Sequence, residues 1–127
     1  MPFWWTFGKV PEVSAPELQQ LAESLDREQI DPKPLIIDVR TEAEYAAGHV
    51  KHAVNASFLP PWSFPNRVEP IVKDVPKSAQ IIVICLSAHR SIGAYKWLRS
   101  EGFSNVKQLA AGMQDWRARH LPEQAQK

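Results

Sequence analysis

The residues best placed to do covalent chemistry surround Cys85, the chain's only cysteine. Cys85 follows the apolar run of residues 81–84 and is followed by a polar loop that leads into a helical pattern. In open α/β sheets, ligands bind outside the carboxyl ends of the strands. A thiol at that position is a candidate nucleophile, and the candidate substrate-binding loop consists of Leu86, Ser87, Ala88, His89 and Arg90.

A helix that begins directly after this loop favours ionisation of Cys85. The first amide N–H groups of a helix have no intrahelical partner, and the helix dipole is positive at that end. Cysteines at helix N-termini or beside cations have pKa values of about 3.5 to 7.5, against about 8.5 for a free thiol. His89 and Arg90 can add positive charge. The plainer alternative, that Cys85 is a small buried hydrophobe at a strand end, stays open from these residues alone.

The segments that must position Cys85 alternate between strand-like and helix-like patterns. This alternation is typical of an α/β domain with a mostly parallel sheet. Residues 81–84 are predicted to be the central strand, because four β-favouring apolar residues in a row indicate cover on both faces. Further strands are predicted at residues 35–39, 53–55 and 106–109.

The first two helices are predicted from their start signals. Ser14 with Glu17, and Thr41 with Glu44, have the spacing of a capping box. A proline-rich segment after residue 58 predicts an irregular connection, with a helix only late, near residues 67–72. The next helix is predicted over residues 91–98 with an apolar stripe of Ile92, Tyr95 and Leu98, and the last over residues 113–120.

Composition indicates one globular domain and excludes several kinds of site. The chain has 127 residues, of which 44% are hydrophobic and 23% charged. Its 15 basic and 14 acidic residues are spread along the sequence, which argues against nucleic acid as a partner. A lone cysteine cannot form an internal disulfide, and Cys/His zinc spacing is absent. We therefore expect no metal, and the reducing environment of the cytoplasm as the compartment.

The chain begins with an aromatic-rich segment. Phe3, Trp4, Trp5 and Phe7 lie close together, without the basic region or the long apolar run of a signal peptide or membrane span. We expect these aromatics to cover an edge of the domain, and a docking surface is the alternative. The predicted organisation is an extension over residues 1–13, a domain over 14–121 and a polar tail over 122–127.

Three ordered segments resemble the rhodanese-like (thiosulfate sulfurtransferase-like) domains. CLSAHRS, from Cys85, resembles the active-site loop of that family. IIDVRTEAEYAAGHVKHAVN, residues 36–55, resembles its Asp-Val-Arg strand end, its acidic-aromatic helix and its Gly-His turn. LAAGMQDW resembles the segment that carries a glycine and then Trp116. The match covers about residues 14–121.

The resemblance implies a fold and a reaction. The fold is α/β, with a five-stranded, mostly parallel sheet flanked by helices on both faces. The reaction is sulfur transfer, in which Cys85 carries a persulfide between a donor such as thiosulfate and an acceptor such as cyanide, a small thiol or a protein thiol. No metal or organic cofactor is implied. Because the chain has no second cysteine, the acceptor must come from outside it. We expect a monomer.

Asp38 and Arg40, at the end of another predicted strand, are taken as supporting residues, with an ion pair that fixes the following helix as their simpler role. The other candidates receive structural interpretations: His49 as a hydrogen-bonded turn residue, His52 and His120 as surface residues and Trp116 as core.

The chain departs from the family pattern at Ala88 and His52, where many members have glycine. A residue other than glycine at either position can therefore change the backbone conformation. The rival function is a rhodanese-like binding module that presents the loop or the aromatic N-terminus to a partner and has little turnover. A phosphatase or arsenate reductase on the same fold is disfavoured, because those relatives have a loop one residue longer.

Overall fold

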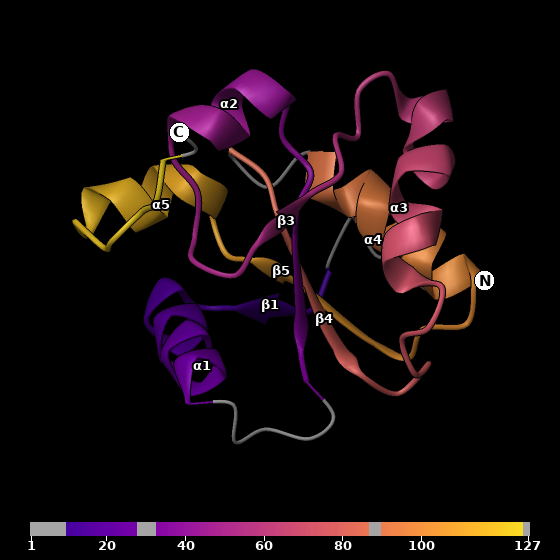
Figure 1. The fold of residues 1–127 in the computed structure, drawn as a ribbon, viewed down its shortest axis with the longest axis horizontal. Coiled ribbons are helices and arrows are strands. Elements are labelled where there is room, and N and C mark those ends of the chain that lie inside the picture. Colours follow the sequence, from indigo (N-terminus) through magenta and orange to yellow (C-terminus); the bar gives the residue numbers. More distant parts are fainter. Residues whose placement is uncertain (1–9, 28–32, 87–89, 126–127) are drawn as a thin grey trace.

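Five parallel strands form one sheet in the order β1-β5-β4-β2-β3 (Figure 1). The structure is a computed structural model that describes residues 10–27, 33–86 and 90–125, without the side chain of Arg90. The predicted α/β class is confirmed, with every strand pairing parallel. The strands are β1 (Glu12–Val13), β2 (Leu35–Asp38), β3 (Val54–Asn55), β4 (Gln80–Ile84) and β5 (Asn105–Leu109).

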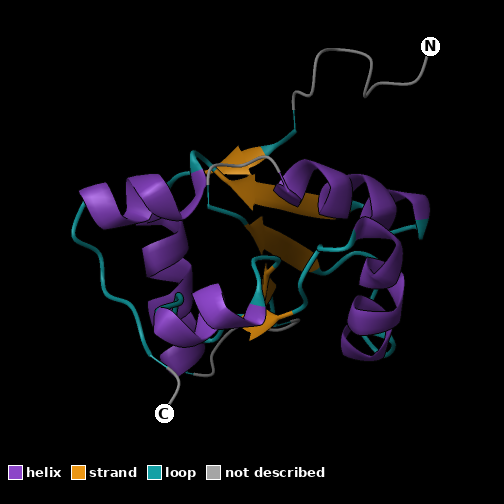
Figure 2. Cartoon of the chain, turned by 90° about the horizontal axis from the view of Figure 1, so that it is seen from above, coloured by secondary structure: helices purple, strands orange, loops and turns teal. Residues whose placement is uncertain are grey.

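Helices cover both faces of this sheet, as expected (Figure 2). Helices α3 and α4 pack on one face, whereas α1 and α5 pack on the other. No helix in the described ranges is long and apolar enough to cross a membrane. The helices are α1 (Ala15–Asp26), α2 (Glu42–Ala47), the short 3-10 helix η2 (Pro61–Ser63), α3 (Phe64–Val72), α4 (Arg90–Ser100) and α5 (Gly112–Ala118).

The central position predicted for residues 81–84 is confirmed, because β4 lies between β5 and β2. Ile81 and Val83 belong to the core cluster under α3 and α4, whereas Ile82 and Ile84 belong to the cluster under α1 and α5. All four side chains are fully buried. Side chains alternate between the faces of a strand, so Cys85, the next residue, joins the cluster under α3 and α4.

Both predicted capping boxes are present. The Ser14 hydroxyl accepts from the amide of Glu17 at 3.2 Å, and the Glu17 carboxylate accepts from the amide of Ser14 at 3.0 Å. This exchange lowers the pKa of Glu17, because the Ser14 amide stabilises the charged carboxylate. Thr41 and Glu44 make the same exchange at the start of α2. Helices α1 and α2 therefore begin where the sequence predicts.

The helix predicted near residues 67–72 is confirmed, but it begins three residues earlier than predicted. The 3-10 helix η2 runs directly into α3, which begins at Phe64. Pro61 and Pro65 cause no break, because each lies at the start of its helix, where no intrahelical N–H bond is lost. The irregular connection is therefore shorter than the prolines alone indicate.

The buried stripe on α4 is shifted from the predicted one. Tyr95 and Leu98 are buried, but Ile92 is only half-buried. Ser91 and Ala94, both fully buried, take the other inward positions. Polar Ser91 therefore occupies a core position that an apolar pattern does not reveal.

Both segments that flank the predicted domain have described residues that contact it. Strand β1 pairs in parallel with β5. At the other end, Pro122 accepts a hydrogen bond from the Trp116 ring nitrogen at 3.0 Å, and the backbones of Gln124 and His49 exchange two hydrogen bonds. Residues 1–9 and 126–127 lie outside the described ranges, and the boundaries of the extension and the tail stay predictions.

His52 has the backbone conformation that the family's glycine pattern implies, with a φ of 72°. Its side chain is exposed, as predicted, and its Nε2 lies 2.7 Å from Oδ1 of Asp26. Lys51 Nζ lies 2.8 Å from the same oxygen. The Lys51 ammonium and then His52 lower the pKa of Asp26. His52 therefore has a left-handed backbone conformation, and its side chain lies beside the Asp26 carboxylate, which also pairs with Lys51.

We expect His52→Gly to be more stable than His52→Ala by about 1 kcal/mol. Both variants lose the contact with Asp26, so their difference isolates the backbone. The left-handed region costs a non-glycine residue about 1 to 2 kcal/mol, which exceeds the roughly 0.4 to 1 kcal/mol of extra unfolded-state freedom of glycine. Urea unfolding measures the difference. An alanine variant as stable as the glycine variant contradicts the argument.

Candidate active site

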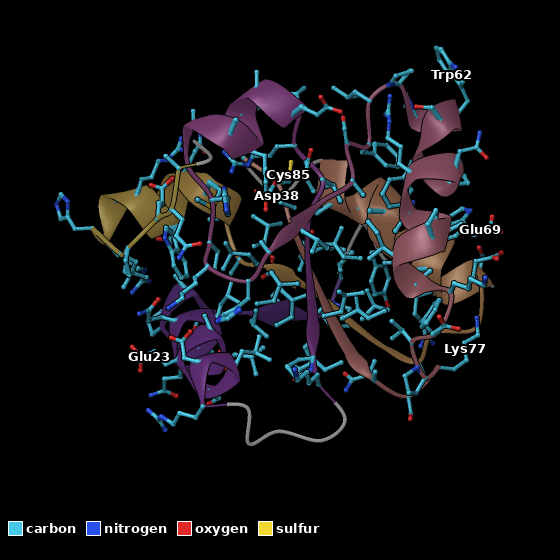
Figure 3. All side chains as sticks on the ribbon, viewed as in Figure 1. Glu23, Asp38, Trp62, Glu69, Lys77 and Cys85 are labelled. Atoms are coloured by element: carbon cyan, nitrogen blue, oxygen red, sulfur yellow. The ribbon has the colours of Figure 1, made fainter. Side chains whose placement is uncertain are left out.

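Cys85 lies directly beyond the carboxyl end of the central strand and is 1% exposed. The chain leaves β2 toward β3 on one side and leaves β4 toward β5 on the other, so a topological switch point lies between β2 and β4. Ligands bind at such points in open α/β sheets. Asp38 pairs in register with Ile84, and Figure 3 shows Asp38 beside Cys85. This placement supports a site, while the catalytic role of Cys85 stays a prediction.

Only part of the predicted binding loop can be located. Leu86 is half-buried and packs against the cluster under α1 and α5. Ser87, Ala88 and His89 lie outside the described residues, as does the side chain of Arg90, whose backbone begins α4. Their proposed roles therefore stay predictions.

The start of the loop is held by the first turn of α5. The carbonyl of Cys85 accepts from the amide of Met113 at 2.8 Å, and the carbonyl of Leu86 accepts from the amide of Gln114 at 3.0 Å. Amides in the first turn of a helix lack intrahelical partners, and carbonyls beyond a strand end lack ladder partners. Each carbonyl therefore gains a donor and each amide gains an acceptor, and α5 fixes the backbone that carries the thiol.

Gly112 makes this contact possible. It has a φ of 59° and directly follows Ala111, which has a φ of 56°. A Cβ on Gly112 would collide with the Cys85 carbonyl oxygen and lie 2.6 Å from the carbonyl carbon and oxygen of Leu86. In the sequence, this glycine stands out only within the LAAGMQDW resemblance. The available signal was its place directly before the last predicted helix.

Asp38 and Arg40 form a buried ion pair, the simpler of the two roles considered for them. The Arg40 Nη2 atom lies 2.8 Å from Oδ2 of Asp38, with the side chains 1% and 0% exposed. Arg40 Nε donates to both carboxylate oxygens, and Nη2 also donates to the carbonyl of Gly48 at 2.6 Å. Because Gly48 caps the end of α2, Arg40 joins both ends of that helix. The supporting role of this pair in the site stays a prediction.

The structural interpretations of His49 and Trp116 are confirmed. His49 Nδ1 lies 2.8 Å from the Tyr45 carbonyl oxygen, and the two rings stack with centroids 3.8 Å apart. The Tyr45 hydroxyl donates to Ala53 at 2.6 Å, and burial raises the pKa of Tyr45. Trp116 is fully buried. Within residues 10–27, 33–86 and 90–125, no three His, Cys, Asp or Glu residues gather as metal ligands.

Comparison with known sequences finds one family. The sequence profile of the Rhodanese-like domain matches residues 17–119. A sulfurtransferase of Allochromatium vinosum is 31% identical over 102 residues, which are 80% of this chain and 89% of that protein. A tRNA uridine(34) hydroxylase of Sodalis glossinidius is 30% identical over 81% of this chain, which spans only 29% of the hydroxylase. The shared unit is therefore small and also occurs within larger proteins.

Comparison with solved structures gives the same fold. The rhodanese-like domain of a protein from Anabaena sp. superposes with a TM-score of 0.71 and 26% sequence identity. The match covers 92% of this chain and 80% of the Anabaena chain. The five-stranded parallel sheet and its two helical layers are therefore those of a known fold.

We expect Gly112→Ala to destabilise the chain far more than Gly102→Ala. Both glycines have positive φ, but a Cβ on Gly102 would meet only Lys77 side-chain atoms, at 3.8 Å or more. The control therefore carries the backbone cost alone, about 1 to 2 kcal/mol. Gly112→Ala must also separate α5 from Cys85 and Leu86, and each lost hydrogen bond adds about 1 kcal/mol. Equal losses in urea unfolding would contradict the close-approach argument.

Proposed function

Because the chain belongs to the rhodanese-like domain family, we propose that it is a sulfurtransferase that carries sulfane sulfur as a persulfide on Cys85. The observation that carries the proposal is the position of Cys85. The thiol follows the central strand at the switch point, and α4 begins five residues later. The free amide groups of a helix start favour an anion, both as the thiolate and as the persulfide.

In the first half-reaction, the Cys85 thiolate attacks the outer sulfur of thiosulfate. A sulfur–sulfur bond forms to Cys85, and the bond between the outer sulfur and the sulfonate breaks. Sulfite leaves with the electron pair of that bond, so the protein gains one neutral sulfur atom and keeps a single negative charge. The loop residues Leu86, Ser87, Ala88, His89 and Arg90 are proposed to surround the donor.

In the second half-reaction, an acceptor attacks the outer sulfur of the persulfide. Cyanide leaves as thiocyanate and a thiolate leaves as a persulfide, while the Cys85 thiolate returns with the electron pair of the broken bond. Cys85 is the only cysteine of the chain, so no internal thiol can accept the sulfur. A reducing compartment such as the cytosol, proposed here, keeps this thiol reduced.

A binding module remains the second candidate because of one surface feature. Trp62 is 82% exposed and Leu59 is 44% exposed. Exposed tryptophans of this kind are frequent anchors in protein interfaces. Figure 3 shows Trp62 at the same end of the sheet as Cys85. The chemistry at Cys85 decides between the two functions.

We expect thiosulfate to add one sulfur atom to Cys85. Intact mass analysis after incubation with thiosulfate measures the gain, and a reducing thiol should remove it. Cys85→Ser is the control that should gain nothing. If the wild-type chain gains no sulfur from thiosulfate, polysulfide or another sulfane donor, the binding module becomes the better function.

We expect Arg90→Ala to raise the KM for thiosulfate about tenfold or more while the fold stays intact. A guanidinium beside the loop would hold the anionic donor through charge-assisted hydrogen bonds, worth roughly 1.5 to 3 kcal/mol when buried. Lys96→Ala removes the same charge from an exposed position on α4, so it controls for long-range electrostatics. Steady-state kinetics measure both variants. Equal KM values for Arg90→Ala and Lys96→Ala would remove Arg90 from the donor site.

A further inference from the structure

Two buried polar side chains meet beneath the first turn of α4. Ser91 is 0% exposed and Gln108 is 4% exposed. The Ser91 hydroxyl donates to Oε1 of Gln108 at 2.6 Å, and Nε2 of Gln108 donates to the Glu12 carboxylate at 3.0 Å. We call Ser91, Gln108 and Glu12 the polar brace. It connects α4 to β5 and to the exposed edge strand β1.

The register of the sheet places the members of the polar brace together. Glu12 on β1 is the direct partner of Gln108 on β5, so the two side chains lie on the same face. Gln108 is two residues beyond Val106, whose side chain packs in the cluster under α3 and α4. The same alternation directs the Gln108 amide toward α4, where Ser91 is buried.

Charge fixes the direction of the hydrogen bonds in the polar brace. An ionised carboxylate only accepts hydrogen bonds, so Glu12 selects the NH₂ group of the Gln108 amide. The amide oxygen is then left to accept from Ser91. With Ser91 and Gln108 buried, these directional hydrogen bonds favour one arrangement, whereas an apolar contact of the same size would admit several. The polar brace therefore specifies where the first turn of α4 lies.

The polar brace holds the end of the loop opposite to the end held by α5. Ser91 directly follows Arg90 at the start of α4, whereas the carbonyls of Cys85 and Leu86 accept hydrogen bonds from the first turn of α5. Both supports come from residues 108–114, which are the end of β5 and the beginning of α5. One short segment thus fixes the loop at its two ends.

We propose that Gln108, held by Glu12 and Ser91, is a positioning residue that sets the first turn of α4 against Cys85. In consequence it controls how well the helix amides stabilise the thiolate and the anionic donor. The effect on donor turnover rests on the proposed function. The effect on the reactivity of Cys85 does not, and the experiment uses this difference.

The test compares Gln108→Met with the wild-type chain. Methionine has a similar length but makes neither hydrogen bond. The rate of Cys85 alkylation by iodoacetamide is measured against pH by intact mass, together with kcat and KM for thiosulfate. The midpoint of the alkylation profile is expected to move toward the free-thiol value of about 8.5. The value of kcat/KM is expected to fall at least about tenfold, because a misplacement of roughly 1 Å can cost an active site about a hundredfold in rate.

Four further variants serve as parallel tests and controls. Glu12→Gln and Ser91→Ala should move the alkylation profile in the same direction as Gln108→Met. They replace Gln108→Met in the test if that variant does not fold. Ser100→Ala, which removes an exposed hydroxyl bonded to Trp97 on the same helix, should leave the profile unchanged. Val68→Ala on α3 should lower stability without moving the profile, because its fully buried side chain is not a member of the polar brace.

A rescue variant tests the direction of the hydrogen bonds. Gln108→Glu places two carboxylates opposite each other and should impair the chain. Adding Glu12→Gln places an amide donor at position 12, so the bond between residues 12 and 108 runs in the reverse direction while Ser91 still donates to residue 108. The double variant should return the profile toward that of the wild type.

The outcomes separate this inference from the proposed function. An unchanged alkylation profile in Gln108→Met, with only a loss of stability, overturns the positioning role. A profile that moves equally in Val68→Ala also overturns it, since general loosening would then explain the shift. If the profile moves in the brace variants alone but the wild-type chain transfers no sulfur, the positioning role stands and the sulfurtransferase proposal fails.

Discussion

Two hydrogen bonds between backbone groups determine how the candidate site is built. The central strand ends at Ile84, and the carbonyls of buried Cys85 and half-buried Leu86, which follow it, leave the sheet. Buried carbonyls need donors, and the first turn of α5 supplies two of them through Met113 and Gln114. The approach is so close that Gly112 has no room for a side chain. The need to pair these carbonyls therefore determines the position of α5, the left-handed turn before it and the path of the chain after Cys85.

The buried Asp38–Arg40 pair plays a comparable part on the neighbouring strand. A buried guanidinium and a buried carboxylate stabilise little by themselves, because their desolvation offsets most of the attraction. The pair instead fixes the local backbone. Arg40 donates a hydrogen bond to the carbonyl of Gly48, and the Asn55 side chain donates to the carbonyls of Asp38 and Arg40. The turn after β2 is thereby fixed beside Cys85, and α2 cannot shift independently of β2 and β3.

Short-range patterns in the sequence predict much of the fold, but they do not reveal contacts between side chains of different elements. The capping boxes at Ser14 and Thr41 and the apolar run of β4 act within a few residues, so their structures follow directly. The early start of α3 depends on where its prolines fall in the helix, which pattern alone does not give. For the site, Cys85 and its strand end are predictable from order along the chain. The contact of Gln108 with Ser91 joins residues from two elements, and only the folded register reveals it.

The pairing of β1 with β5 has a consequence for how the domain assembles. The Glu12–Gln108 hydrogen bond joins residues 96 positions apart, and among the described strands β1 pairs only with β5. During synthesis this contact cannot form until β5 has left the ribosome and paired with β4. Contacts of such long sequence separation are also slow to form in refolding, because a large loop must close first. The surroundings of Cys85 are therefore completed only when nearly the whole domain is in place, and a partly made chain carries its thiol without them.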